Sequence, residues 1–202
     1  FWDKYLIAEP AVSLGKQFAF ISYHPVTTEH EGAYEQMKEI FDAMKSVNIS
    51  FLVITPNIDG GSKGVHRAIL EARADQSVAQ RAVFLKRLTP EDFAFVVARA
   101  AVLVGNSSSF IREASYFGTP SVVIGSRQQL RERAQNVHDV PCEAGAIAEA
   151  TRSQLAHGRY PRHTLFGDGH GAQRIADTLC SIDLNKSLLD KGFFDVSFSY
   201  GQ

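Results

Sequence analysis

The chain has 202 residues, of which 45% are hydrophobic and 21% charged, and its 21 Lys and Arg nearly balance its 22 Asp and Glu. These proportions fit an ordinary globular domain and argue against a disordered chain, a collagen-like repeat or a coiled coil. The near-neutral charge excludes the broad basic surface of a general nucleic-acid binder, and no apolar run reaches the roughly 20 residues that span a bilayer.

The two cysteines, Cys142 and Cys180, are too few for a disulfide framework and too far apart for a CxxC metal site. We interpret both as small core residues of a protein in a reducing compartment, the cytoplasm. No signal peptide is visible, and no pair of histidines has convincing metal-ligand spacing, so we expect no metal. Because the sequence begins with Phe1 and not with Met, we expect a further segment upstream.

Short β-branched runs alternate with longer amphipathic stretches along the chain, which is the pattern of a parallel α/β sheet. The first run is apolar almost throughout, as in a strand that is buried on both faces. The expected strands cover residues 17–23, 51–55, 82–85, 101–104, 121–124 and 136–140.

Helices are predicted between these strands from apolar residues at three- and four-residue spacing. Ser62 is expected to cap a helix that carries Val65, Ile69 and Leu70. Another helix opens at Thr89, with Pro90 as its first residue and acidic residues in its first turn. The remaining helices are expected at about 31–47, from the 105–109 turn to about 117, at 143–155 and at 171–180.

Six strands joined by right-handed crossovers predict a doubly wound, mainly parallel Rossmann-like sheet of the α/β class. We divide the chain into a lead-in from a missing upstream domain (1–16), the Rossmann-like domain (17–185) and a C-terminal tail (186–202). Ligands of such sheets bind outside the carboxyl ends of the strands. The polar residues expected there are His24, Asn57, the 106–109 group and Arg127.

The segment from Gly105 to Ser109 joins a buried strand to a helix, where free N–H groups and serine hydroxyls suit a phosphate. The alternative is an ordinary Ser or Asn helix cap. The sequence contains no G-x-G-x-x-G after the first strand, no P-loop and no G-x-S-x-G elbow, which disfavours a dinucleotide site, a P-loop site and a serine hydrolase.

Three further residues near this crevice have two interpretations each. Glu113 is placed to accept hydrogen bonds from both ribose hydroxyls, or it is a solvated helix residue beside Arg112. Arg127 is placed to neutralise a phosphate, or it belongs to a solvated basic loop. His24 either contacts a phosphate or moves a proton, or it is an incidental loop residue.

Taken together, the segments after the strands resemble the UDP-N-acetylglucosamine 2-epimerase family. The first two segments, His-Pro-Val-Thr-Thr and Pro-Asn-Ile-Asp, are most similar to the hydrolysing branch, which starts sialic-acid-type pathways. The resemblance covers residues from about 17 to about 185. It is carried by 24–28, 56–63, 105–108, 112–113, 117–120, 125–128 and 167–169.

The resemblance implies one half of a two-domain, glycosyltransferase-B-like fold, whose other Rossmann-like half carries the carboxylates that act on the sugar. It implies that UDP and UDP-N-acetylglucosamine bind here without a cofactor, with Glu113 on the ribose and the serines and Arg127 on the diphosphate. No catalytic residue is assigned in this half beyond His24 as a candidate. The implied UDP-binding residues are His24, Asn57, Ser107, Ser108, Glu113 and Arg127.

The implied reaction removes the proton at carbon 2, eliminates UDP and adds water with inversion at that carbon, giving N-acetylmannosamine or an analogue. Ser109-Phe110 stands where many relatives have a small residue followed by glycine, and we expect Phe110 either to narrow the crevice or to change how the chain approaches the diphosphate. Relatives inhibited at a subunit interface make Lys63 and Arg67 candidate members of an effector site, and a homo-oligomer is then expected. The alternatives are a non-catalytic UDP-binding module and the donor half of a non-hydrolysing epimerase or a glycosyltransferase.

Overall fold

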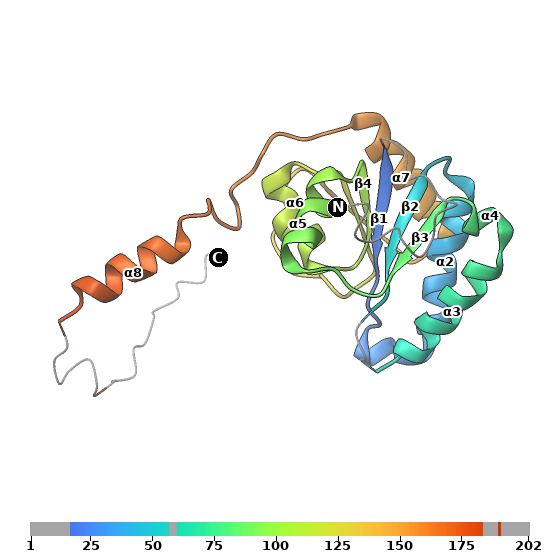
Figure 1. Cartoon of the computed structure of the whole chain (residues 1–202), viewed down its shortest axis with the longest axis horizontal. Coiled ribbons are helices and arrows are strands. Elements are labelled where there is room, and N and C mark those ends of the chain that lie inside the picture. The colour runs from blue at the N-terminus through green and yellow to red at the C-terminus, as the bar shows by residue number, and fades with distance from the viewer. Residues whose placement is uncertain (1–16, 57–59, 184–189, 191–202) are drawn as a thin grey trace, which may run out of the picture. The chain divides into compact units, whose positions relative to one another are not determined.

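The computed structural model describes residues 17–56, 60–183 and 190. Asn57 therefore lies outside the described residues. The described residues up to Phe166 form one compact unit, and those from Gly167 on form a second, smaller one. The first unit contains the sheet and all but one of the helices described (Figure 1).

The first unit is built on six parallel strands in the order β3-β2-β1-β4-β5-β6, which confirms the predicted six-stranded Rossmann-like sheet. The order turns back at β1, so that the chain builds one half of the sheet outward and then returns to build the other. The strands are β1 (Phe18–Ser22), β2 (Ser50–Ile54), β3 (Ala82–Leu85), β4 (Val102–Gly105), β5 (Ser121–Ile124) and β6 (Val137–Val140).

Helices cover both faces of this sheet (Figure 1). One face carries α2 (Ala33–Ser46), α3 (Ser62–Ala74), the short α4 (Gln76–Ala79) and α7 (Ala144–His157). The other carries α5 (Pro90–Arg99), the 3₁₀ turn η3 (Ser108–Phe110) and α6 (Arg112–Phe117). A second 3₁₀ turn, η2 (Thr27–Gly32), leads into α2.

Each central strand supplies side chains to two separate cores because successive residues point to opposite faces. In β1, Ala19 and Ile21 pack under α2, α3 and α7, whereas Phe18 and Phe20 pack on the α5 and α6 side. All five residues of β1 are buried, as predicted for a strand covered on both faces.

The predicted start of α5 is confirmed in detail, whereas that of α3 is not. Thr89 caps α5 by accepting a hydrogen bond from the Asp92 N–H, and Pro90 is the first helical residue. Ser62 is itself the first residue of α3, and Gly61 stands before it at a φ of +85°. Of the three apolar residues that the predicted helix carries, Val65 and Ile69 are buried, whereas Leu70 is 66% exposed.

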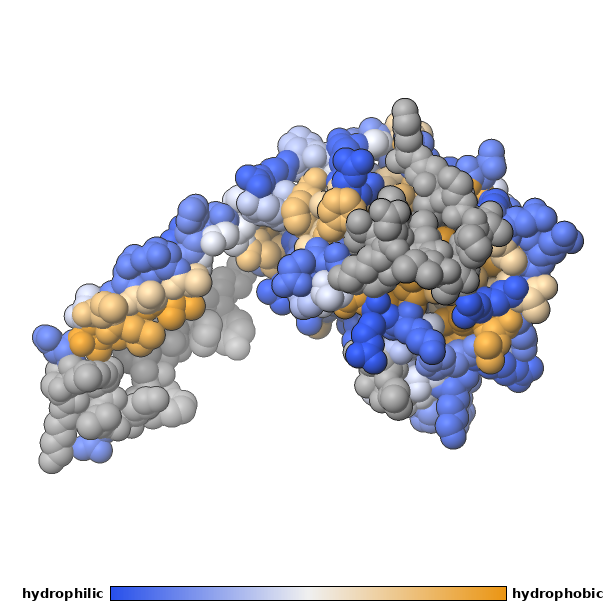
Figure 2. All heavy atoms as spheres, in the orientation of Figure 1, coloured by the Kyte–Doolittle hydropathy of each residue, from blue (hydrophilic) through white to orange (hydrophobic). Residues whose placement is uncertain are grey.

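The second unit contains α8 (Gly171–Ser181), as predicted from sequence. An ion pair between Asp168 and Arg174 stabilises its first turn and holds the pKa of the Asp168 carboxyl well below its ordinary value. Ile175 and Leu179 are exposed and contribute to the hydrophobic band along α8 in Figure 2. Cys180 is also exposed, so its interpretation as a core residue is wrong.

Within the described ranges, none of the helices has both the length and the apolar character needed to cross a membrane.

Candidate functional site

The candidate site lies at the carboxyl ends of β1 and β4, the two neighbouring strands at which the strand order reverses. Gly105, the last residue of β4, pairs with Ser22, the last residue of β1. Gly105 has a φ of +146°, and a Cβ at this position would lie 2.1 Å from the Ser22 carbonyl oxygen. Only glycine permits this close approach, after which both strands end at the switch point where sheets of this kind bind their ligands.

His24 begins the loop after β1 and is held there by its backbone. The His24 N–H donates to Asn106 Oδ1 over 2.8 Å, and Asn106 Nδ2 donates to the His24 carbonyl over 2.7 Å. The His24 side chain is half-buried, with its Nε2 3.5 Å from Ser22 Oγ. The ring therefore lies at the crevice, where a proton donor or acceptor can reach a ligand.

The serine-rich turn after β4 is a capped 3₁₀ turn, and the α-helix itself starts only at Arg112. Ser107 Oγ accepts from the Ser109 N–H, and the Ser107 and Ser108 carbonyls accept from the next two amides of the turn. Within the described part of the chain, the Ser107 and Ser108 amides have no acceptor. Two adjacent N–H groups of this kind suit an anionic oxygen.

Phe110, which we expected to narrow the crevice, lies instead in the core beneath the turn. It is fully buried, and its ring meets that of Phe20 edge-on at 5.6 Å between centroids. The physical reason is that burial of this large apolar ring among the core residues on the α5 and α6 side is favourable. The expectation of a narrowed crevice is therefore wrong.

Arg127 approaches the same crevice from the loop after β5. Its Nη1 donates to the Asn106 carbonyl oxygen over 3.1 Å, and Gln128 Nε2 donates to the same oxygen over 2.8 Å. Arg127 is exposed and has no carboxylate partner among the described residues. A guanidinium in this state can form charge-assisted bonds to a phosphate.

A chain of hydrogen bonds ties η2 to the loop that carries Arg127. Ser126 Oγ donates to Glu29 Oε1, and Gln36 Nε2 donates to Glu29 Oε2, over 2.7 and 2.8 Å. Gln36 accepts in turn from the Tyr23 hydroxyl, whose pKa burial raises far above its ordinary value. The loops after β1 and β5 are thus linked both through Glu29 and through Asn106.

Glu113 lies in the first turn of α6, with an exposed side chain. It is six residues beyond Ser107, on the helix that follows the serine turn. The position is open to solvent, and both the ribose-binding and the solvated interpretations stand as predictions.

Comparison with known proteins assigns the chain to a family. The family model described as UDP-N-acetylglucosamine 2-epimerase matches residues 3–180. The chain belongs to this family. Its strand-end segments can therefore be considered as parts of an epimerase-family Rossmann-like domain.

A relative from Legionella pneumophila, named UDP-N,N'-diacetylbacillosamine 2-epimerase (hydrolyzing), is 32% identical over 87% of this chain and 46% of its own length. The Escherichia coli polysialic acid biosynthesis protein P7 is 28% identical over 67% of this chain and 34% of its own. The UDP-GlcNAc 2-epimerase of Neisseria meningitidis, solved bound to UDP-GlcNAc, has a TM-score of 0.63 at 16% identity over 89% of this chain and 49% of that one. The chain thus spans about half the length of such relatives or less.

Two residues of this epimerase-family edge, Asn106 and Gln128, were not among the UDP-binding residues that the sequence analysis assigned. Asn106 is fully buried and bonds to both His24 and the Arg127 loop, and Gln128 is 2% exposed. Asn106 is the first residue of the predicted 106–109 polar group, but its partners are 82 and 21 residues away. The available signal was a polar residue directly after a buried strand, which does not by itself separate a ligand contact from a structural contact.

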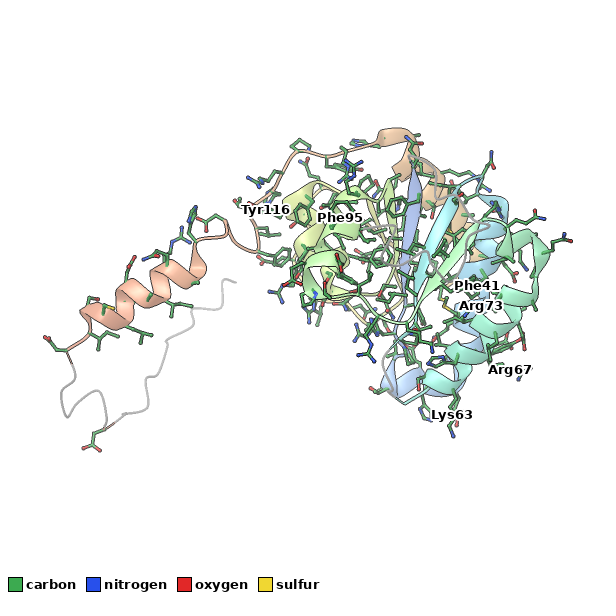
Figure 3. The ribbon with its side chains drawn as sticks, viewed as in Figure 1. Phe41, Lys63, Arg67, Arg73, Phe95 and Tyr116 are labelled. Atoms are coloured by element: carbon green, nitrogen blue, oxygen red, sulfur yellow. The ribbon has the colours of Figure 1, made fainter. Side chains whose placement is uncertain are left out.

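Lys63 and Arg67, the candidate effector residues, lie on the first two turns of α3 and point away from the sheet (Figure 3). Arg67 Nε is 3.0 Å from Glu71 Oε1, and its guanidinium lies 4.5 Å from the centre of the Tyr34 ring. Lys63 is exposed. The effector role of both stays a prediction.

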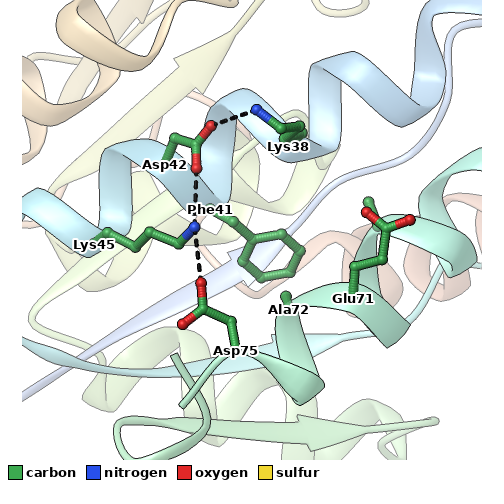
Figure 4. Close-up of a pocket in the computed structure, with 8 residues that line it drawn as sticks. Lys38, Phe41, Asp42, Lys45, Glu71, Ala72 and Asp75 are labelled. Atoms are coloured by element: carbon green, nitrogen blue, oxygen red, sulfur yellow. Dashed lines mark hydrogen bonds and ion pairs between the residues drawn. The ribbon is translucent and has the colours of Figure 1, made fainter. Parts of the chain in front are cut away.

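A pocket of about 200 Å³ lies between α2 and α3. It contains alternating charges that are paired with one another, from Lys38 to Asp42, Lys45 and Asp75 (Figure 4). Since these charges satisfy one another, the pocket offers a ligand little unpaired charge.

The described residues of the first unit indicate neither a reactive cysteine nor a metal site. Burial is the main cause that raises the pKa of the half-buried Cys142 thiol to about 11, which keeps it protonated at neutral pH. Among the residues that the structure describes, no group of three or more His, Cys, Asp and Glu is arranged to hold a metal ion.

Proposed function

We propose that this chain is the UDP-binding half of a hydrolysing UDP-N-acetylglucosamine 2-epimerase. The observation that carries the proposal is the meeting of three segments at the β1–β4 edge. They are the His24 loop, the Ser107–Ser108 turn and the Arg127 loop, all of which contact or adjoin Asn106. Their combined chemistry is that of a diphosphate site.

The diphosphate is assigned to the Ser107 and Ser108 amides and hydroxyls and to the Arg127 guanidinium. Backbone amides provide fixed dipoles, and an arginine adds charge-assisted hydrogen bonds in a fork that matches phosphate oxygens. His24 is assigned to a UDP phosphate, to which it donates a hydrogen bond or transfers a proton. Glu113 is assigned to the ribose hydroxyls, and Asn57, outside the described residues, is retained as a further contact.

The proposed reaction removes the proton at carbon 2, expels UDP and adds water with inversion at carbon 2, giving N-acetylmannosamine and UDP. The residues assigned to the phosphates stabilise the negative charge that develops on UDP as it leaves. Because the fold holds these donors in place, they need not rearrange during this step. None of the described residues is assigned as the base that removes the proton at carbon 2. We assign that base to the other Rossmann-like half of the two-domain fold. The motif forms and the relative named for polysialic acid biosynthesis support a place in sialic-acid-type sugar synthesis.

A second candidate substrate is favoured by the Legionella relative, whose name specifies UDP-N,N'-diacetylbacillosamine. That sugar shares the 2-acetamido group and the UDP leaving group, so the nucleotide contacts assigned here serve both substrates. Because the two sugars differ beyond carbon 2, the choice between them depends on contacts to the sugar itself.

Titration calorimetry of the 202-residue chain with UDP, UMP and uridine tests the nucleotide site. We expect weak UDP binding that exceeds uridine binding, since the diphosphate supplies the charged contacts. Equal binding of uridine and UDP, or no binding at millimolar concentration, would contradict the proposal. In a separate assay of UDP release, we expect the chain to be inactive on both UDP-sugars, because a missing base typically costs about 10²–10⁴-fold.

A further inference from the structure

We propose that Asn106 is the positioning residue of the nucleotide site, which it sets by fixing the backbone of His24 and the loop of Arg127. The inference rests on the proposed function, because it concerns the same crevice. Asn106 acts through its neighbours, since its side chain is fully buried and satisfied by the protein.

The Asn106 side chain replaces one rung of the parallel ladder between β1 and β4. Backbone pairing ends with Ser22 opposite Gly105, and the Asn106 N–H still donates to the Ser22 carbonyl over 3.1 Å. Beyond this point the side-chain amide takes over, accepting from the His24 N–H and donating to the His24 carbonyl. Turning the amide around would oppose donor to donor and acceptor to acceptor, so its orientation follows from the backbone it meets.

The Asn106 backbone carbonyl holds the third segment, the Arg127 loop, in place. It accepts from Gln128 Nε2 over 2.8 Å and from Arg127 Nη1 over 3.1 Å, so both of its lone pairs point to the loop after β5. One residue therefore fixes the chain after β1, β4 and β5. The next residue, Ser107, opens the turn whose amides are assigned to the diphosphate.

Asn136 provides a matched control at the opposite edge of the sheet, just before β6. It is 2% exposed, its Nδ2 donates to the Thr119 carbonyl over 2.8 Å, and its own carbonyl accepts from the Ser121 N–H and from Gln154 Nε2. It thus resembles Asn106 in burial and in the number of segments it joins. It lies at the amino edge, however, whereas the proposed crevice is at the carboxyl edge.

The test compares Asn106→Ala with Asn136→Ala by thermal unfolding, by calorimetric titration with UDP, and by hydrogen exchange of the His24 and Ile21 amides. We expect both variants to melt at lower temperature. Only Asn106→Ala is expected to bind UDP more weakly, by about tenfold, since two hydrogen bonds that position the site are lost. The His24 amide should also exchange at least about tenfold faster in Asn106→Ala, while Ile21, inside β1, stays protected.

If Asn106→Ala does not fold, Asn106→Ser is measured in the same way, because its smaller polar side chain leaves room for a water molecule. Unchanged His24 exchange overturns the inference, and so does a variant at Asn106 that binds UDP as tightly as Asn136→Ala does. Absence of UDP binding by the unsubstituted chain overturns the proposed nucleotide site instead. The two failures are therefore distinguishable.

Discussion

Two polar regions of the first unit differ in how their charges are used. On the α2–α3 face, Lys38, Asp42, Lys45 and Asp75 form a continuous set of ion pairs. At the β1–β4 edge, the Arg127 side chain donates to the Asn106 carbonyl and has no carboxylate partner among the described residues, and there the Ser107 and Ser108 amides have no acceptor. The contrast shows that the density of charged residues does not identify a ligand site. Donors that converge without partners are the better guide.

The largest expected effect is on stability, at Gly105, where β4 lies very close to the Ser22 carbonyl of β1. Gly105→Ala should destabilise the fold by about 3 kcal/mol or more, because it combines an unfavourable φ with a clash against the Ser22 carbonyl. Gly145→Ala is the control, since Gly145 lies in α7 with open space around it, and should gain up to about 1 kcal/mol. Denaturant unfolding of both variants measures the difference, and equal stabilities would contradict the close approach.

Arg127→Ala should weaken UDP binding by about tenfold or more and leave uridine binding nearly unchanged. The reason is that a charge-assisted hydrogen bond contributes about 1.5–3 kcal/mol and that uridine has no phosphate to use it. Arg131→Ala removes the same charge from the same exposed loop and serves as the control in calorimetry. Equal losses for UDP and uridine would mean that Arg127 acts through the loop structure.

Glu113→Gln should have the opposite specificity, weakening uridine and UDP alike by several-fold while leaving pyrophosphate binding unchanged. A carboxylate accepts from two ribose hydroxyls, whereas an amide offers only one acceptor oxygen. Glu149→Gln, on the exposed side of α7, is the control. Uridine affinity equal to that of the unsubstituted chain would exclude Glu113 from the ribose role.

The smallest effect is expected on the α2–α3 face, where Ser77 first and Lys45 second lower the pKa of Asp75 from 3.8 to about 2. A carboxyl whose pKa is lower in the folded chain stabilises it above pH 3.8, and this contribution disappears as the pH falls toward 2. Because Asp75 is on the surface, we expect the loss to stay below about 1 kcal/mol.

Ser77→Ala should reduce this acid-dependent loss, since the serine donates to Asp75 from both its hydroxyl and its amide and only the hydroxyl bond is removed. Unfolding at a series of pH values between 2 and 5 measures the slope. The variant should bind UDP like the unsubstituted chain. A change in UDP affinity would show that the α2–α3 face and the β1–β4 edge are coupled.

The sequence alone determined the six strands, their mainly parallel arrangement and the capped start of α5. These features depend on neighbours in the chain: buried strands are short apolar runs, and Thr89, Pro90 and Asp92 meet within one turn. The segments of the candidate edge could be found for the same reason, since each follows directly after a strand.

Tertiary structure alone decided which side chains meet. The contact of Asn106 with His24 joins residues 82 positions apart, and no local period encodes it. The same holds for Phe110, which lies in the core beneath the turn, and for Leu70, which has the helical spacing of a core residue but faces solvent. Local patterns fix backbone conformation, whereas burial and partners depend on how distant elements pack, and the packing here makes a buried asparagine the link among three strand ends.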